Sequence, residues 1–198
     1  MGLDISGIVG LDLSLTSTGF ARIGLNPKIE PVFHNIFKTD PKEGTDIERC
    51  LKIAQEIVMH STKADLFFIE DYAYGIKAKA SRLATLGELG GVVKIVIMKH
   101  TKCEPFVVTP GTWKKFLCGK GNLNKDSFKL EVFKKYDIEP MENDDAAAIA
   151  ICDFAACALR GEKHREMLKY EQACIKKYRE DHPELRTRLQ ALANRLVD

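Results

Sequence analysis

Apolar residues form several short runs within the first 40 positions of the chain. The run at 8–14 is nearly continuous, and the segments 19–24 and 31–38 have the composition of further strands. The links between these segments are short, which favours an antiparallel meander over crossover connections. We therefore predict three neighbouring strands at the start of the chain.

The hydrophobic spacing then changes to that of helices. Thr45 and Glu48 have the spacing of a capping box and precede recurring apolar residues, which predicts a helix over about 46–61. A buried strand is expected at 64–72, followed by a glycine-containing helix at 81–99. The spacing thus indicates a strand between two helices.

The second half of the chain adds one short strand and several helices. The expected elements are a strand at 105–109, a helical turn or two at 113–117 behind a Thr-Pro start, a basic loop at 119–125, and helices at 126–136 and 143–159. This order predicts an α/β fold in which a five-stranded mixed sheet is flanked by helices. We expect one domain over 1–160 and a charged helical extension over 161–198.

Composition narrows the class of protein. The 198 residues are 45% hydrophobic and 29% charged, a globular mixture that excludes a collagenous or wholly disordered chain. No apolar run reaches the roughly 18 residues of a membrane-spanning helix, so no membrane partner is expected. The six cysteines include no CxxC pair, which favours reduced thiols and a cytoplasmic location, in a bacterium or a phage-infected host.

The small net charge of +2 conceals a strong segregation along the chain. Residues 75–136 carry 13 basic and 4 acidic side chains, a net of +9, whereas residues 137–159 carry 6 acidic and no basic side chains. A basic middle beside an acidic segment indicates a surface that attracts a polyanion and a separate gathering of carboxylates. Solvated helix faces are the simpler explanation for any single lysine.

Two acidic residues interrupt apolar strands, where an uncompensated charge is costly. Asp12 lies within the first strand, and Glu70 ends the fourth. If these strands are neighbours, the two side chains lie about 5 Å apart on one face. Asp71 should point away from Glu70, because side chains alternate along a strand.

The acidic segment supplies further carboxylates at the start of the last core helix. Glu142 and Asp145 are three residues apart and project from one side of that helix. Four clustered carboxylates repel one another without a cation, which favours a site for Mg²⁺ or Mn²⁺ over Zn²⁺. Two such ions about 4 Å apart suit phosphodiester hydrolysis. Alternatively, Glu142 and Asp144 are simply favourable acids at a helix N-terminus.

Five segments in order resemble a known family. Residues 10–21, 68–70, 86–92, the basic positions of 114–125, and 142–150 are similar to the first hairpin, second acidic motif, central helix, basic loop and closing acidic helix of the RuvC-type Holliday junction resolvases. These resolvases are members of the ribonuclease H-like superfamily. The similarity covers about residues 7–159.

This resemblance implies a metal-dependent endonuclease that acts as a homodimer on branched DNA, especially four-way junctions. By position, the implied catalytic and metal-binding residues are Asp12, Glu70, Glu142 and Asp145, holding two Mg²⁺ ions for which Mn²⁺ substitutes. The family usually has Asp or His at the position of Glu142, so Asp144 is an alternative ligand. The glycines at 87, 90 and 91 favour helix packing, and the resemblance favours the dimer over packing on the chain's own sheet.

The basic middle then supplies candidate DNA contacts. Lys114 and Lys125 are expected near the scissile phosphate, and an aromatic side chain is expected to stack on an unpaired base. The full set of expected DNA-binding residues is Tyr72, Tyr74, Lys77, Lys79, Arg82, Lys114, Lys115, Lys120 and Lys125. For the lysines the alternative role is solubility, and for the tyrosines it is core packing.

Three other functions compete with the junction endonuclease. A non-catalytic junction-binding protein would explain the atypical Glu142. A phosphotransferase of the actin and sugar-kinase type would use the hydroxyl-rich hairpin at 12–19 to bind phosphate, but such proteins need two domains of this kind. An RNA-processing nuclease of the same superfamily would share the chemistry and differ only in its substrate.

Overall fold

The computed structural model of the chain describes residues 5–25, 32–71, 80–121, 125–161, 164–185 and 187. Its strands are β1 (Gly7–Asp12), β2 (Ser17–Gly24), β3 (Phe33–Lys38), β4 (Asp65–Glu70) and β5 (Phe106–Val108). Its helices are η1 (Pro41–Glu43), α1 (Asp46–Met59), α2 (Ala80–Thr101), α3 (Pro110–Cys118), α4 (Lys125–Tyr136), α5 (Asn143–Arg160) and α6 (Lys169–Asp181).

The strands form one mixed sheet in the order β3-β2-β1-β4-β5. Strands β1, β2 and β3 pair as an antiparallel meander, and β4 and β5 continue from β1 in parallel. The predicted five-stranded mixed sheet and its opening meander are therefore confirmed. The capping box before α1 is also confirmed, because Thr45 Oγ1 accepts from the Glu48 N–H while the Glu48 carboxylate accepts from the Thr45 N–H.

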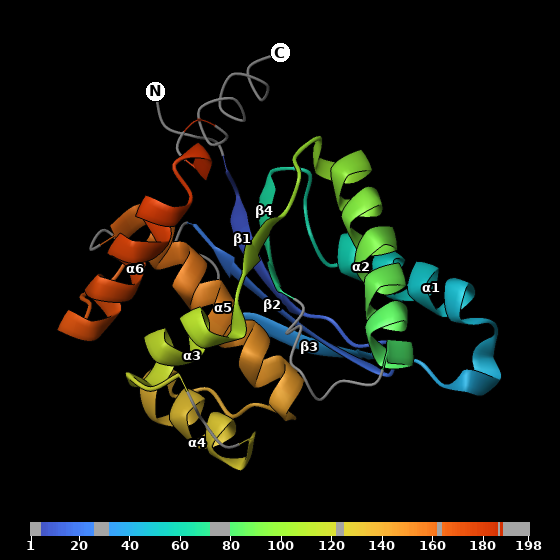
Figure 1. Cartoon of the computed structure of the whole chain (residues 1–198), viewed down its shortest axis with the longest axis horizontal. Helices are drawn as coiled ribbons and strands as arrows, with labels where there is room; N and C mark the ends of the chain where they lie inside the picture. Colours follow the sequence, from blue (N-terminus) through green and yellow to red (C-terminus); the bar gives the residue numbers. More distant parts are fainter. Residues whose placement is uncertain are drawn as a thin grey trace.

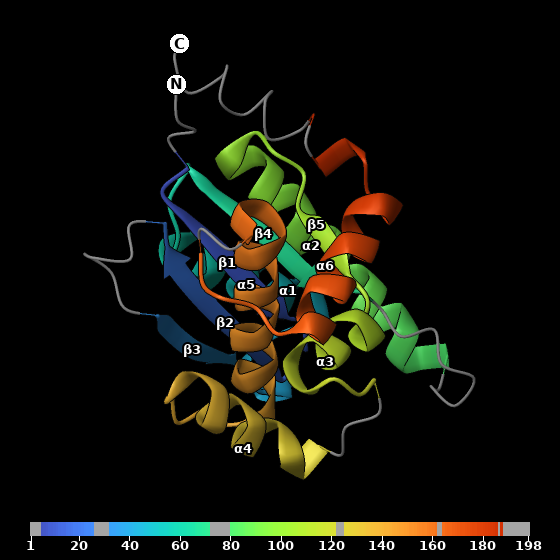
Figure 2. The same ribbon diagram turned by 90° about the vertical axis from the view of Figure 1, so that its left-hand side faces the viewer.

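Helices cover both faces of the sheet. Helices α1 and α2 lie on one face, whereas α3, α4, α5 and α6 lie on the other (Figures 1 and 2). Along β1, Ile8 contributes to the core beneath α5, while Val9 and Leu11 contribute to the core beneath α1 and α2. Because both faces are buried, β1 is a continuous apolar run rather than an alternating one.

Two glycines set how closely α5 approaches the sheet. A Cβ added at Gly10 would lie 2.4 Å from the Ala148 carbonyl oxygen, and one added at Gly19 would lie 1.9 Å from the Asp144 carbonyl oxygen. Real side chains do not come this close to backbone atoms, so both positions require glycine. The N-terminal turn of α5 is thereby held directly against β2, next to the end of β1.

Helix α6 packs on the same side as α5, adding Cys174, Ile175 and Tyr178 to the core. The Tyr178 hydroxyl donates to the Val107 carbonyl oxygen of the edge strand β5 at 3.2 Å. The charged segment at the end of the chain thus begins with a helix whose apolar face is buried. No helix of the described residues has the length and apolarity needed to cross a membrane.

Candidate active site

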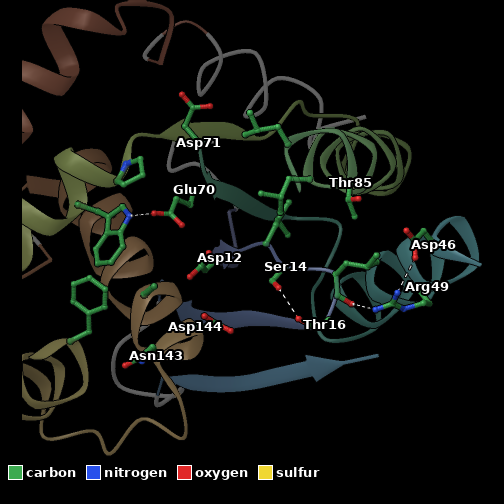
Figure 3. A pocket seen from close by; sticks show the side chains of 18 of the residues that line it. Asp12, Ser14, Thr16, Asp46, Arg49, Glu70, Asp71, Thr85, Asn143 and Asp144 are labelled. Carbon is green, nitrogen blue, oxygen red and sulfur yellow. Dashed lines mark hydrogen bonds and ion pairs between the residues drawn. The ribbon is translucent and has the colours of Figure 1, made fainter. Parts of the chain in front are cut away.

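A cleft of about 790 Å³ opens at the carboxyl ends of β1 and β4. Its lining comes from the β1–β2 hairpin, the starts of α1 and α5, and helices α2, α3 and α4 (Figure 3). Carboxylates from three elements line one part of the cleft: Asp12 from β1, Glu70 from β4 and Asp144 from α5. This part of the cleft is the candidate active site.

The parallel pairing of β1 with β4 explains why Asp12 and Glu70 meet. Their preceding residues, Leu11 and Ile69, are direct partners in the register, so the two acids end their strands side by side. Figure 3 shows the two side chains on the same side of the sheet. The prediction that neighbouring strands bring these acids together is confirmed.

Burial and the neighbouring charges strongly shift the pKa of Asp12. Burial raises the pKa of Asp12 well above its usual range, and Glu70 raises it further through its charge and a shared hydrogen bond. The charge of Asp144 raises the same pKa, while the Lys114 ammonium lowers it. A divalent cation bound between these oxygens would relieve the repulsion, and an all-oxygen donor set suits a hard ion. The residues therefore fit a metal site.

The geometry differs from the sequence prediction at Glu142. Glu142 is the N-cap of α5, and its carboxylate pairs with Lys38 and accepts from the Ser17 hydroxyl at 3.2 Å. The hydrogen bond from Lys38 lowers the pKa of Glu142 below its usual value. These contacts direct the side chain to the β2 and β3 side of the helix end, away from the cleft that Asp12 and Glu70 line.

Asp145 is likewise turned away from the cleft. The residue is fully buried, and its carboxylate accepts from the backbone N–H groups of Met141 at 2.8 Å and Glu142 at 2.7 Å. His34 Nδ1 of β3 lies 3.0 Å from the same carboxylate. The Asp145 carboxylate thus caps the start of α5 by accepting from the N–H of the N-cap residue Glu142, which is one half of a capping box.

The alternative ligand, Asp144, is the α5 acid that lines the cleft. One turn later, Ala147 lines the same cleft, which identifies the 144/147 face as the one directed at Asp12. Neither Glu142 nor Asp145 is among the residues that line the cleft, so the structure does not bring the expected four carboxylates together, and their assignment as metal ligands stays a prediction. The structure brings together Asp12, Glu70 and Asp144, and Asp71 lies at the rim pointing away from Glu70, as expected (Figure 3).

The predicted DNA-binding residues are only partly described. Lys114 is half-buried and lines the cleft, while Lys115 and Lys120 are exposed at the end of α3 and just after it. Tyr72, Tyr74, Lys77 and Lys79 lie outside the described residues. Arg82 and Lys125 belong to α2 and α4, but their side chains are outside the description.

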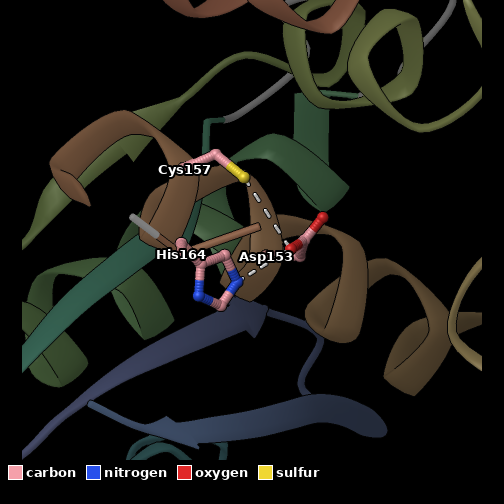
Figure 4. Close-up of side chains that lie close together, drawn as sticks. All are labelled: Asp153, Cys157 and His164. Carbon is pink, nitrogen blue, oxygen red and sulfur yellow. Dashed lines mark hydrogen bonds and ion pairs between the residues drawn. The ribbon is translucent and has the colours of Figure 1, made fainter. Parts of the chain in front are cut away.

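A second group of candidate metal ligands, Asp153, Cys157 and His164, lies near the C-terminal end of α5 (Figure 4). However, Arg165 donates to both oxygens of Asp153, with a shortest distance of 2.7 Å, and Tyr136 donates to Asp153 at 2.8 Å. Burial, with the Asp153 charge, raises the pKa of Cys157 to about 12. We assign the group to a buried network of charges and hydrogen bonds.

This network connects α5 to α6, because Arg165 also pairs with the fully buried Glu171 at 2.7 Å. We expect Arg165→Met to lower the free energy of unfolding by about 3 kcal/mol, since it leaves two buried carboxylates without their shared cation. Urea denaturation measures this loss. The exposed Lys176→Met should change stability by less than about 0.5 kcal/mol, and an equally small effect of Arg165→Met would contradict the assignment.

The free energy of unfolding lost in Arg165→Met should also depend on pH. Burial acts to raise the pKa of Asp153, but hydrogen bonds from His164 and Arg165 outweigh it and hold that pKa well below its usual value. A lowered native pKa stabilises the fold above the unfolded pKa of about 4, and this stability is lost as the pH falls further. The wild type should therefore lose stability as the pH falls below about 4, and Arg165→Met, in which Asp153 lacks this cation, should lose less over the same range.

Comparisons with known proteins agree with this fold. No protein-family model matches the chain. The protein named crossover junction endodeoxyribonuclease RuvC from the Wolbachia strain wRi of Drosophila simulans is 32% identical over 152 residues, covering 73% of this chain and 91% of that protein. RuvC of Wolbachia pipientis wMel matches with the same identity and coverage. The chain belongs to the RuvC family.

Solved RuvC structures support the same assignment at the level of the fold. Thermus thermophilus RuvC matches with a TM-score of 0.61 and 21% identity, covering 78% of this chain and 96% of that one. T. thermophilus RuvC in complex with a Holliday junction substrate matches with a TM-score of 0.60 and 19% identity, covering 74% and 90%. The predicted family and the ribonuclease H-like fold are confirmed, and nucleases of the RuvC family are metal-dependent.

Proposed function

We propose that the protein is an endonuclease that cleaves four-way DNA junctions by metal-dependent phosphodiester hydrolysis. The observation that carries this proposal is the meeting of Asp12, Glu70 and Asp144 in one cleft of a RuvC-family fold. Clustered carboxylates without a cation are costly, so their gathering is explained by divalent ions. We further propose Mg²⁺ as the ion, two per site, with Mn²⁺ able to substitute.

The described residues at the cleft have different proposed roles. Asp12, Glu70 and Asp144 would hold the ions, which would supply charge stabilisation at the phosphate and orient the reacting groups. Lys114 lines the same cleft, and its ammonium would contact a phosphate oxygen bound beside the carboxylates. The exposed Lys115 and Lys120 extend the positive surface beyond the cleft and would contact phosphates farther along the strand.

A panel of labelled four-way junction, fork, flap, duplex DNA and structured RNA tests this function. We expect cleavage of the junction with Mg²⁺, no cleavage in EDTA, and at least about a hundredfold slower cleavage of plain duplex and RNA. Junction binding without cleavage under any metal condition would favour a non-catalytic binding protein. Faster cleavage of the RNA than of the junction would favour an RNA-processing enzyme.

We also propose that the active form is a homodimer that pairs through α2. The face of α2 that carries Gly87, Gly91, Ile95 and Met98 is exposed, and Ile95 and Met98 are 55% and 47% accessible. A Cβ at either glycine would meet nothing within 4 Å, so packing inside the described chain does not explain them. Small residues beside exposed apolar ones suit the close approach of a second α2.

We expect Ile95→Glu to shift the protein from dimer to monomer, since it places a charge in a self-complementary apolar contact. Sedimentation velocity at micromolar concentration measures the change. Leu168→Glu is the matched control, because Leu168 is 59% exposed before α6 and should leave the dimer intact. A monomeric wild type, or an Ile95→Glu variant that stays dimeric, would exclude this interface.

A further inference from the structure

Trp113 is buried beside the candidate metal site. The side chain, on α3, is 1% exposed, and its Nε1 donates to Glu70 Oε1 at 3.0 Å, the dashed line at Glu70 in Figure 3. The indole N–H is a donor only, and a buried donor needs a partner. Glu70 supplies that partner, so the two side chains fix each other across the floor of the cleft.

This hydrogen bond restricts a side chain that is otherwise loosely held. The terminal torsion of a glutamate is broad, so a strand position alone does not orient its carboxylate. Trp113 engages one oxygen of Glu70, and Asp12 ends the neighbouring strand in the same cleft. The indole thereby sets the direction in which Glu70 presents its remaining lone pairs toward Asp12.

The same ring also supports the neighbouring lysine. Lys114 Nζ lies 5.2 Å from the centroid of the Trp113 ring and 5.1 Å from that of Phe128. Aromatic faces at this distance attract an ammonium group. The two rings therefore hold the Lys114 ammonium in the cleft that Asp12 and Glu70 also line.

We propose that Trp113 is a positioning residue of the metal site, which orients the Glu70 carboxylate through its indole N–H and supports the Lys114 ammonium with its ring. This inference rests on the proposed function, because Glu70 matters here as a metal ligand. A tryptophan that only filled the core would contribute to stability, but metal affinity would not depend on its N–H group.

Fluorescence tests the link without any cleavage assay, because Trp113 is the one tryptophan in the sequence. Titration of Mg²⁺ into the wild-type protein should produce a saturable change in Trp113 emission. Glu70→Gln should abolish the change at the concentrations that saturate the wild type, whereas the remote Glu180→Gln should retain it. A wild-type emission that does not respond to Mg²⁺, or an unaltered response in Glu70→Gln, would overturn the inference.

The variant Trp113→Phe removes the N–H group and keeps an aromatic ring. We expect its half-saturating Mg²⁺ concentration for junction cleavage to rise about tenfold or more, as for other residues that orient metal ligands, with metal-free junction binding unchanged within about twofold. Phe116→Leu is the control, because Phe116 is a fully buried aromatic residue of the same helix that packs against Phe154. It should lower the melting temperature without raising the Mg²⁺ requirement.

The results separate the two proposals. If Trp113→Phe and Phe116→Leu affect stability alike and neither changes the Mg²⁺ requirement, Trp113 is only a core residue and the inference fails. If the wild type cleaves no junction but Mg²⁺ still alters Trp113 emission through Glu70, the proposed function fails while the positioning role stands. Mg²⁺-dependent cleavage without any emission change contradicts the inference alone.

Discussion

Glu70→Gln and Asp12→Asn should each reduce junction cleavage in Mg²⁺ by at least about a thousandfold. Each change removes one negative charge and one strong oxygen ligand from the centre of the site, while the amide keeps nearly the same volume. The fold should persist, because both residues end their strands at the cleft rather than in the core. Single-turnover cleavage of a labelled four-way junction measures the effect.

Junction binding should be largely unaffected in the same variants. Binding depends on lysine contacts with phosphates over a wide surface, and removing a carboxylate lowers the repulsion of DNA. We expect the dissociation constant, measured without divalent ions, to stay equal or to decrease by up to about threefold. Normal cleavage by either variant would show that the cleft at β1 and β4 is not the catalytic site.

Asp144→Asn should be nearly as damaging as the changes at β1 and β4, with a loss of about a hundredfold or more in cleavage rate. The matched change Glu142→Gln, two residues away at the same helix end, should alter the rate by less than about threefold. The difference follows from geometry, because Asp144 lines the cleft with Asp12 whereas Glu142 pairs with Lys38 on the surface. Cleavage rates of both variants at several Mg²⁺ concentrations test this contrast.

The opposite ranking would restore the assignment that the sequence suggests. If Glu142→Gln abolished cleavage and Asp144→Asn did not, the N-terminal turn of α5 would have to rotate when metal and DNA bind. Melting temperatures supply the control, since both residues are partly exposed and neither change should lower the melting temperature by more than about 3 °C.

Much of the fold is predictable from local pattern. The meeting of Asp12 and Glu70 is predictable because each acid stands in or at the end of an apolar run, where its charge needs a compensating partner. The helix starts follow from short-range signals such as Thr45 with Glu48. These elements depend on residues close together in sequence, so the sequence alone predicts them.

Which face of α5 points into the cleft is harder to predict, because a Glu-x-x-Asp pair has two uses. The spacing of Glu142 and Asp145 suits two metal ligands and equally suits a capping box, and both use carboxylate oxygens. The choice depends on contacts from distant residues: His34 approaches Asp145, and Gly19 brings the helix end against β2. These contacts join residues that are far apart in the chain, so no short stretch of the sequence predicts them.

Trp113 shows the same limit. Its place in a short helix after β5 is predictable, but the partner of its N–H group is not, because Glu70 is 43 residues earlier in the chain. The signal that remains in the sequence is indirect: a lone tryptophan followed directly by a lysine, in the basic segment expected to meet phosphate. A tryptophan next to a lysine indicates a candidate contact between an aromatic ring and a cation.

The most direct test of the account is the position of bound metal. Crystals of the protein soaked in Mn²⁺ should give anomalous density between the carboxylates of Asp12, Glu70 and Asp144, and none at Asp153, Cys157 and His164. Density that instead involves Glu142 and Asp145, or that lies at the Asp153 group, would contradict the proposed site.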